Sequence, residues 1–275
     1  NNAGLKIDQE LTNLYVPFTE KAAFAERERR KSQGILALPQ RLPEMEMTED
    51  FINKQAENSA IAFLTLGRNS GENGDRVVDN DFNLGKDEIV LIDKFSKAFH
   101  AKGKKVVVIL NIGGVIETAS WKDKVDAILL AWQPGQEGGN SVADVLAGKV
   151  NPSGKLTMTF PMKYEDIPSA KNWLGTPAEN PKEVTYEEGI YVGYRYFNTF
   201  KVKPSYEFGF GKSYTDFSYS DLKLSSATFK NNLKVTVKIT NTGKVSGKEI
   251  VELYLSAPQK LVDKPNAELK AFAKT

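Results

Sequence analysis

One carboxylate in this sequence has a setting suited to proton transfer. Glu72 lies between Gly71 and Gly74, and arginines flank that stretch at positions 68 and 76. Glycines let a backbone turn outward and project an acidic side chain, and a positioned carboxyl can serve as a general acid and base. The alternative interpretation, a solvated loop glutamate, is the default for an arbitrary Glu. The residues alone leave both interpretations standing.

The elements around Glu72 predict an open α/β sheet. A helix is expected after the loop, at 86–102, and another near 138–147. Strands are expected at residues 60–66, 106–111, 127–132 and 156–160. Because these runs are continuously apolar, they favour a doubly wound, mainly parallel sheet covered on both faces. Loops that follow the strands of such sheets are where the chemistry is usually presented.

The two ends of the chain differ from this central pattern. The first fifty residues are mostly helical, and Thr48 is a plausible N-cap for a helix that runs to Ala56. Residues 160–215 are rich in aromatic residues, Pro and Gly, which is typical of an extended arm or linker. From Phe217 the hydrophobic period becomes two, as in antiparallel strands. The sequence begins without Met, so we expect it to start inside a longer chain.

Composition excludes several classes of function. With 37 basic and 35 acidic residues the net charge is +2, and no basic stripe suggests a nucleic-acid partner. The absence of cysteine excludes disulfides and thiol catalysis, and the single histidine, His100, excludes multi-histidine metal sites. No apolar run approaches the length of a membrane span. We expect no cofactor and no metal. A homo-oligomer is compatible with the sequence, as are periplasmic and cytoplasmic locations of the bacterial type.

A glycine-rich turn at residues 135–139 raises the alternative of a nucleotide-binding α/β domain. The turn follows a predicted strand and precedes a predicted helix, but it lacks the Lys-Ser/Thr pair of a phosphate-binding loop. A tight turn that packs a helix close to the sheet is the better interpretation. Glu137 then lies in the first helical turn, where an anion offsets the helix dipole.

Four stretches resemble glycoside hydrolase family 3 of the β-glucosidase type, outside its barrel domain. The stretches are GRNSGENGDR (67–76), WQPGQEGGNSVADVLAGKVNPSGKLTMTFP (132–161), YEEGIYVGYRYF (186–197) and YEFGFGKSYTDFSYSDL (206–222). They follow the family's order and spacing and cover almost the whole chain. The resemblance implies an α/β sandwich domain at 1–215, including the arm at 160–215. It also implies a fibronectin type III-like, immunoglobulin-like sandwich at 216–275, truncated because such domains need about 100 residues.

The resemblance also implies an activity. Family members are retaining β-glycosidases, in which an Asp nucleophile on a (β/α)8-type barrel works with an acid/base Glu on a loop of the sandwich domain. Glu72 matches that loop, while nothing in this chain resembles the barrel. The expected function is hydrolysis of terminal non-reducing β-D-glucosyl residues, with β-glucosides or cello-oligosaccharides as substrates. This chain alone is expected to be inactive, and the missing barrel is its expected partner.

Other residues receive subordinate roles. Arg68 and Arg76 are expected to hold the loop by pairing with Asp75, Asp79 or Asp81, and a contact from Arg68 to a sugar hydroxyl is the weaker alternative. Among the tryptophans, Trp173 is the best candidate for a sugar subsite wall. A non-catalytic carbohydrate-binding or scaffold fragment is the alternative to the enzymatic function. The presence of a barrel with an Asp nucleophile in the parent protein would discriminate between them.

Overall fold

The computed structural model describes residues 3–34, 37, 40–69 and 75–275. The chain forms two compact units. The first unit comprises Asn1–Ala143 and Phe160–Ala170, and the second comprises Asp144–Thr159 and Lys171–Thr275. The expected boundary at residue 215 refers to family domains rather than to compactness, so it stays a prediction.

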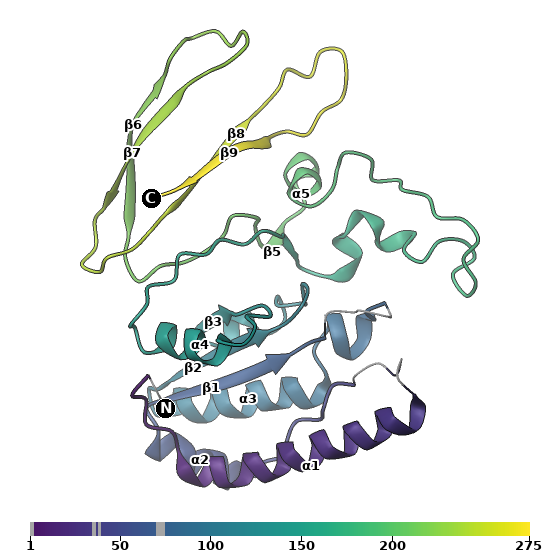
Figure 1. The fold of residues 1–275 in the computed structure, drawn as a ribbon, viewed down its shortest axis with the longest axis vertical. Helices are drawn as coiled ribbons and strands as arrows, with labels where there is room; N and C mark the ends of the chain where they lie inside the picture. Colours follow the sequence, from purple (N-terminus) through teal and green to yellow (C-terminus); the bar gives the residue numbers. More distant parts are fainter. Residues whose placement is uncertain (1–2, 35–36, 38–39, 70–74) are drawn as a thin grey trace. The chain divides into compact units, whose positions relative to one another are not determined.

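The first unit is built on a parallel sheet of three strands in the order β1-β2-β3 (Figure 1). The strands are β1 (Ile61–Gly67), β2 (Lys105–Asn111) and β3 (Ala127–Leu130). Leu64 of β1 lies opposite Val108 of β2, which in turn lies opposite Ile128 of β3. Because the strands run parallel, their carboxyl ends meet at one edge, and the loop that carries Glu72 leaves from that edge.

Helices supply the rest of this unit. They are α1 (Gln9–Gln33), α2 (Glu49–Asn58), α3 (Lys86–Ala101) and α4 (Gly138–Leu146), the last of which continues into the second unit. Figure 1 shows α3 lying along one face of the sheet. The predicted N-cap of α2 is confirmed, since the Thr48 side chain accepts a hydrogen bond from the Phe51 N–H at 3.3 Å.

The hydrophobic core lies between α3, α2 and one face of the sheet. Along β1, Ala62, Leu64 and Leu66 are buried in it, whereas Ile61 and Phe63 on the opposite face are 43% and 40% exposed. The prediction of a sheet covered on both faces is therefore wrong for β1 in the part of the chain that the structure describes. The apolar residues of β1 do not alternate with polar ones, so its sequence gives no sign of this exposed face.

The strand expected at 156–160 is also corrected by the structure. Only Phe160–Pro161 forms a strand, β4, within the first unit. Leu156 belongs to the second unit, where its N–H donates to the Phe210 carbonyl oxygen at 2.8 Å. The Leu156 backbone is thus bonded to a loop instead of a neighbouring strand.

The second unit contains α5 (Tyr194–Phe200), β5 (Pro204–Tyr206) and two antiparallel pairs. The pairs are β6 (Phe217–Leu224) with β7 (Val235–Asn241), and β8 (Ile250–Leu255) with β9 (Glu268–Lys274). Alternation of exposed and half-buried residues along β7 matches its period-two sequence. The fold class is thus as predicted: mixed α/β with a parallel sheet, followed by small antiparallel sheets.

Candidate functional site

The candidate acid/base Glu72 lies outside the described residues, but both ends of its loop are described. The loop leaves the sheet at Gly67, the last residue of β1, and is described again from Asp75. An arginine discussed in the sequence analysis lies at each end: Arg68 follows Gly67, and Arg76 follows Asp75. The positions of these two arginines therefore define the ends of the loop.

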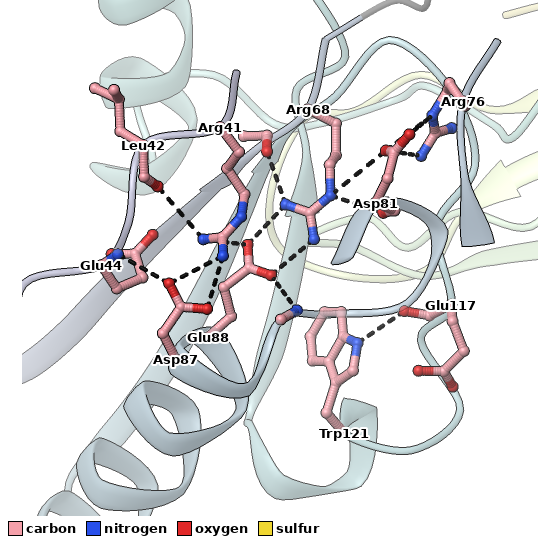
Figure 2. Close-up of polar contacts among 12 residues, drawn as sticks. Arg41, Leu42, Glu44, Arg68, Arg76, Asp81, Asp87, Glu88, Glu117 and Trp121 are labelled. Carbon is pink, nitrogen blue, oxygen red and sulfur yellow. Dashed lines mark hydrogen bonds and ion pairs between the residues drawn. The ribbon is translucent and has the colours of Figure 1, made fainter. Parts of the chain in front are cut away.

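Arg68 fixes the first end from inside the core. Its side chain is 2% exposed, and it forms a two-pronged ion pair with Glu88, from Nη1 at 2.7 Å and from Nη2 at 2.8 Å. Nη1 also donates to the Gly67 carbonyl oxygen, and Nε donates to that of Asp81, each at 2.7 Å. Figure 2 shows the guanidinium lying between these acceptors. Such planar pairing is the geometry in which Arg holds carboxylates most firmly.

Glu88 explains why this cation is tolerated in the core. Its side chain is 1% exposed and lies in the first turn of α3, where a negative charge is favoured by the helix dipole. Its Oε2 accepts the Gly85 N–H at 2.7 Å, so the carboxylate caps the helix and pairs with Arg68 at once. A Cβ at Gly85 would lie 2.5 Å from Asp87 Oδ1 and 2.7 Å from Arg41 Nη2, so a larger residue would displace these two side chains.

Beside Glu88 lies a half-buried group of charges (Figure 2). Arg41 Nη2 donates to Asp87 at 2.7 and 2.9 Å, and its Nη1 lies 3.7 Å from Glu88. Burial acts to raise the pKa of Asp87, but the hydrogen bonds from Arg41 and from the Glu44 N–H outweigh it and lower that pKa to about 2. Glu44 behaves in the opposite way, because burial raises its pKa despite the hydrogen bond from Tyr15. The arginine at the first end of the loop is thus supported by a second layer of charge.

Arg76 fixes the other end of the loop. Its Nη2 donates to Asp81 Oδ1 at 2.7 Å and its Nε donates to both carboxylate oxygens at 3.0 and 3.1 Å. Nη1 donates to the Val115 carbonyl oxygen at 2.9 Å. A Cβ at Gly114 would lie 2.7 Å from that nitrogen, so this glycine makes room for the guanidinium. Asp81 is one of the three partners expected from the sequence.

Asp81 itself lies in the short π-type turn Val78–Phe82. Within this turn Asn80 has a φ of 60°, in the left-handed region that asparagine tolerates better than most residues. Phe82 is buried, its carbonyl oxygen accepts the Glu117 N–H at 2.8 Å, and its ring meets Tyr164 edge-on. Val77, by contrast, is 62% exposed. Phe82 therefore packs this turn against the rest of the first unit.

Four further residues have side chains outside this network of charges. Trp173 is 52% exposed and belongs to the second unit, so its role as a subsite wall stays a prediction. Trp132 is half-buried and packs against Phe160. Glu117 accepts hydrogen bonds from the Ser120 N–H and Oγ at 2.6 and 2.7 Å, so its carboxylate caps this turn. His100 lies in the last turn of α3 and contacts Asp126 at 2.9 Å.

The glycine-rich turn at 135–139 borders a hollow of about 430 Å³ at the carboxyl edge of the sheet. Its described lining consists of neutral residues: Thr65, Ile109, Asn111, Ala131, Gln133, Pro134, Gly135, Gly138, Gly139 and Val142. A phosphate site would be expected to present a cation there. Gly138 is packed so closely that a Cβ would lie 2.4 Å from Pro134 Cγ, which fits the prediction of a tight turn.

Among the described side chains, no group of three or more His, Asp or Glu residues is placed to hold a metal ion. No helix in the described ranges is long and apolar enough to cross a membrane.

Comparison with known proteins identifies the family. Residues 7–194 match the glycosyl hydrolase family 3 C-terminal domain. The chain belongs to glycoside hydrolase family 3. Among curated relatives, β-glucosidase A of Butyrivibrio fibrisolvens is 36% identical over 274 residues, which cover 86% of this chain and 32% of the relative. Thermostable β-glucosidase B of Acetivibrio thermocellus is 38% identical over 231 residues, covering 82% and 29%.

Solved structures of the family agree with the fold over the whole length. β-Glucosidase 3B from Thermotoga neapolitana in complex with α-D-glucose superposes with a TM-score of 0.91 at 47% identity, covering all of this chain and 38% of that one. A β-glucosidase from Paenibacillus barengoltzii gives 0.86 at 34% identity, covering 98% and 29%. This member of the family thus spans about a third of the length of these relatives.

Proposed function

We propose that this chain is the acid/base-bearing part of a retaining β-glycosidase that hydrolyses terminal non-reducing β-D-glucosyl residues. The match to the family 3 C-terminal domain over residues 7–194 carries the proposal. Relatives that cover most of the chain are β-glucosidases, and solved relatives were crystallised with glucose. The substrates proposed here are accordingly β-glucosides and cello-oligosaccharides.

Glu72 is the proposed general acid and base. Retaining hydrolysis uses two carboxyl groups, one that attacks the anomeric carbon and one that protonates the departing oxygen. As the bond from C1 to the leaving oxygen breaks, the Glu72 carboxyl gives that oxygen its proton. An Asp on a barrel domain outside these 275 residues forms the glycosyl-enzyme. The Glu72 carboxylate then takes a proton from the water that releases the sugar.

The described residues on either side of Glu72 in the sequence support this role. The loop begins at the carboxyl end of β1, where parallel α/β sheets present functional groups. Both flanking arginines are paired with carboxylates, Arg68 with Glu88 and Arg76 with Asp81. A free cation beside the acid would favour its ionised form and weaken it as a proton donor. Pairing the arginines reduces that effect while leaving them able to hold the loop.

The test is a leaving-group series on the complete enzyme with Glu72→Gln. General acid catalysis is typically worth about 10²–10⁴-fold, so cellobiose-like substrates should lose rate by about that factor. Aryl glucosides whose phenols have a low pKa need little protonation, and their glycosylation step should lose much less.

The matched control for this series is Glu137→Gln. Glu137 is an exposed carboxylate in the other glycine-rich turn, and its contact with Asn140 Nδ2 at 2.7 Å can be kept by Gln. The Glu137→Gln variant should hydrolyse every substrate at close to the wild-type rate. A near-normal rate of Glu72→Gln on cellobiose would remove Glu72 from the proposed role.

A further inference from the structure

Asp81 receives contacts from both ends of the loop at 69–75. Through its backbone carbonyl oxygen it accepts the Nε–H of Arg68 at 2.7 Å. Through its carboxylate it accepts Nη2 of Arg76 at 2.7 Å and Nε at 3.0 and 3.1 Å. The Val77 N–H adds a longer contact to Oδ2 at 3.3 Å. One residue therefore connects the two arginines that bound the loop (Figure 2).

Each arginine also has a second, independent attachment. Arg68 is held by the carboxylate of Glu88 at the start of α3, and Arg76 by the Val115 carbonyl oxygen beyond β2. Asp81 in turn is held by its position next to buried Phe82. The two ends of the loop, residues 68 and 76, are thus held by contacts to α3, to the segment after β2 and to the π-type turn.

We propose that Asp81 is a positioning residue for catalysis, which sets the ends of the loop so that its acid/base residue meets the leaving oxygen. This inference rests on the proposed function of Glu72. Proton transfer requires heavy atoms within about 3 Å, and a displacement of about 1 Å can cost 10²-fold in rate. A side chain that fixes the ends of a short loop therefore affects the rate without touching the substrate.

The ion pair between Asp81 and Arg76 determines which variant is suitable for a test. Asp81→Asn keeps the size of the side chain and the backbone carbonyl that Arg68 uses, but removes the charge that both Nε and Nη2 of Arg76 require. Arg76 would then keep its bond to Val115 and lose its two-pronged partner. The change acts mainly on the second end of the loop and leaves the buried pair of Arg68 and Glu88 intact.

The experiment compares Asp81→Asn with Asp79→Asn in the complete enzyme. Asp79 is an exposed carboxylate in the same turn, so its variant makes the same change in charge. For Asp81→Asn we expect kcat on cellobiose to fall by about 10- to 100-fold with KM within about twofold. The loss should shrink for aryl glucosides with good leaving groups. Asp81→Glu should restore part of the rate, and Asp79→Asn should match wild type.

Two results would overturn the inference. One is an unchanged kcat for Asp81→Asn, and the other is an equal loss on all leaving groups, which would indicate a folding or binding defect. If Asp81→Asn does not fold, Arg76→Lys carries the same expectation, because lysine keeps the charge but cannot make the two-pronged contact. Running Glu72→Gln in parallel separates the two proposals. If the rate loss depends on the leaving group in Glu72→Gln but not in Asp81→Asn, only the role of Asp81 is contradicted. If the rate loss in Glu72→Gln does not depend on the leaving group, the proposed function itself is contradicted.

Discussion

Asp87 and Glu44 show how neighbouring carboxylates can respond to acid in opposite directions. The pKa of Asp87 is lowered to about 2 against an ordinary 3.8, since Arg41 and the Glu44 N–H outweigh its partial burial. A carboxyl whose pKa is lowered by folding stabilises the folded state at every pH above its ordinary pKa. This stabilisation is lost as the pH falls through the lowered pKa. The pKa of Glu44 is raised by burial, so its protonation favours the folded state. Acid therefore removes the stabilisation that Asp87 provides, and it also removes the destabilisation caused by burying the Glu44 charge.

Asp87→Asn should lower stability at neutral pH by on the order of 1–2 kcal/mol, a value reduced for partial exposure. The difference from wild type should persist down to about pH 4 and be lost as the pH falls through about 2, because the wild-type carboxyl then becomes protonated as well. Denaturant midpoints measured at intervals of pH would show this. Asp93→Asn, an exposed site on the same helix with Lys124 as partner, is the control and should change little. A difference that is constant down to pH 2 would contradict the assignment.

Sequence reasoning recovered only part of this network. It named Asp81 among the partners of Arg76, because loop carboxylates close in sequence are natural candidates. It missed the pairing of Arg68 with Glu88, which are twenty residues apart and meet only because α3 folds back along β1. The available signal was the position of Glu88, three residues after the N-cap Gly85, where a carboxylate serves as a cap. A buried arginine right after a strand then needs such a partner.

At the scale of elements, the start of α3 does most to hold the first end of the loop. Glu88 caps the helix and neutralises Arg68, with both side chains at most 2% exposed. Helix α3 was predicted at 86–102 and is observed at Lys86–Ala101, since its apolar period and first-turn acids are local signals. The expected strand at 156–160 was wrong because short apolar runs form strands only when a neighbouring strand is available, and no local pattern reveals that.

Glu88→Ala should destabilise the first unit by about 3–5 kcal/mol, because it leaves the Arg68 charge buried without its partner. Loss of the cap on Gly85 acts in the same direction. The measurement is the urea midpoint followed by the fluorescence of tryptophan, for which buried Trp121 in this core is a suitable reporter. Asp93→Ala removes an exposed pair on the same helix and should cost no more than about 1 kcal/mol. Equal effects of the two variants would show that Glu88 has no special role.

At the scale of the whole molecule, the proposed function makes this chain one part of a larger enzyme. It covers between 29% and 38% of the length of the four β-glucosidases described above. Helix α1 has no buried residue, and the Ile61 and Phe63 face of β1 is exposed in the part of the chain that the structure describes. The sequence predicted the family and the order of the elements from motifs. It could not place Glu72 relative to the nucleophile, which in the proposed function lies on a barrel domain.

We expect the 275-residue chain alone to hydrolyse no aryl β-glucoside, because it would supply an acid without a nucleophile or a pocket for the sugar ring. Release of a chromogenic phenol by the pure chain is the measurement, with the complete enzyme as the positive control. Turnover above the rate of buffer would contradict the division of catalytic groups between domains.

The most direct test of the central claim is azide rescue of Glu72→Gln in the complete enzyme. With an aryl glucoside that has a good leaving group, the variant should form the glycosyl-enzyme but hydrolyse it slowly, since no base activates water. Azide needs no base, so it should raise the rate and yield β-glucosyl azide, while wild type yields glucose. A Glu72→Gln enzyme that is unaffected by azide and forms no glucosyl azide would contradict the account.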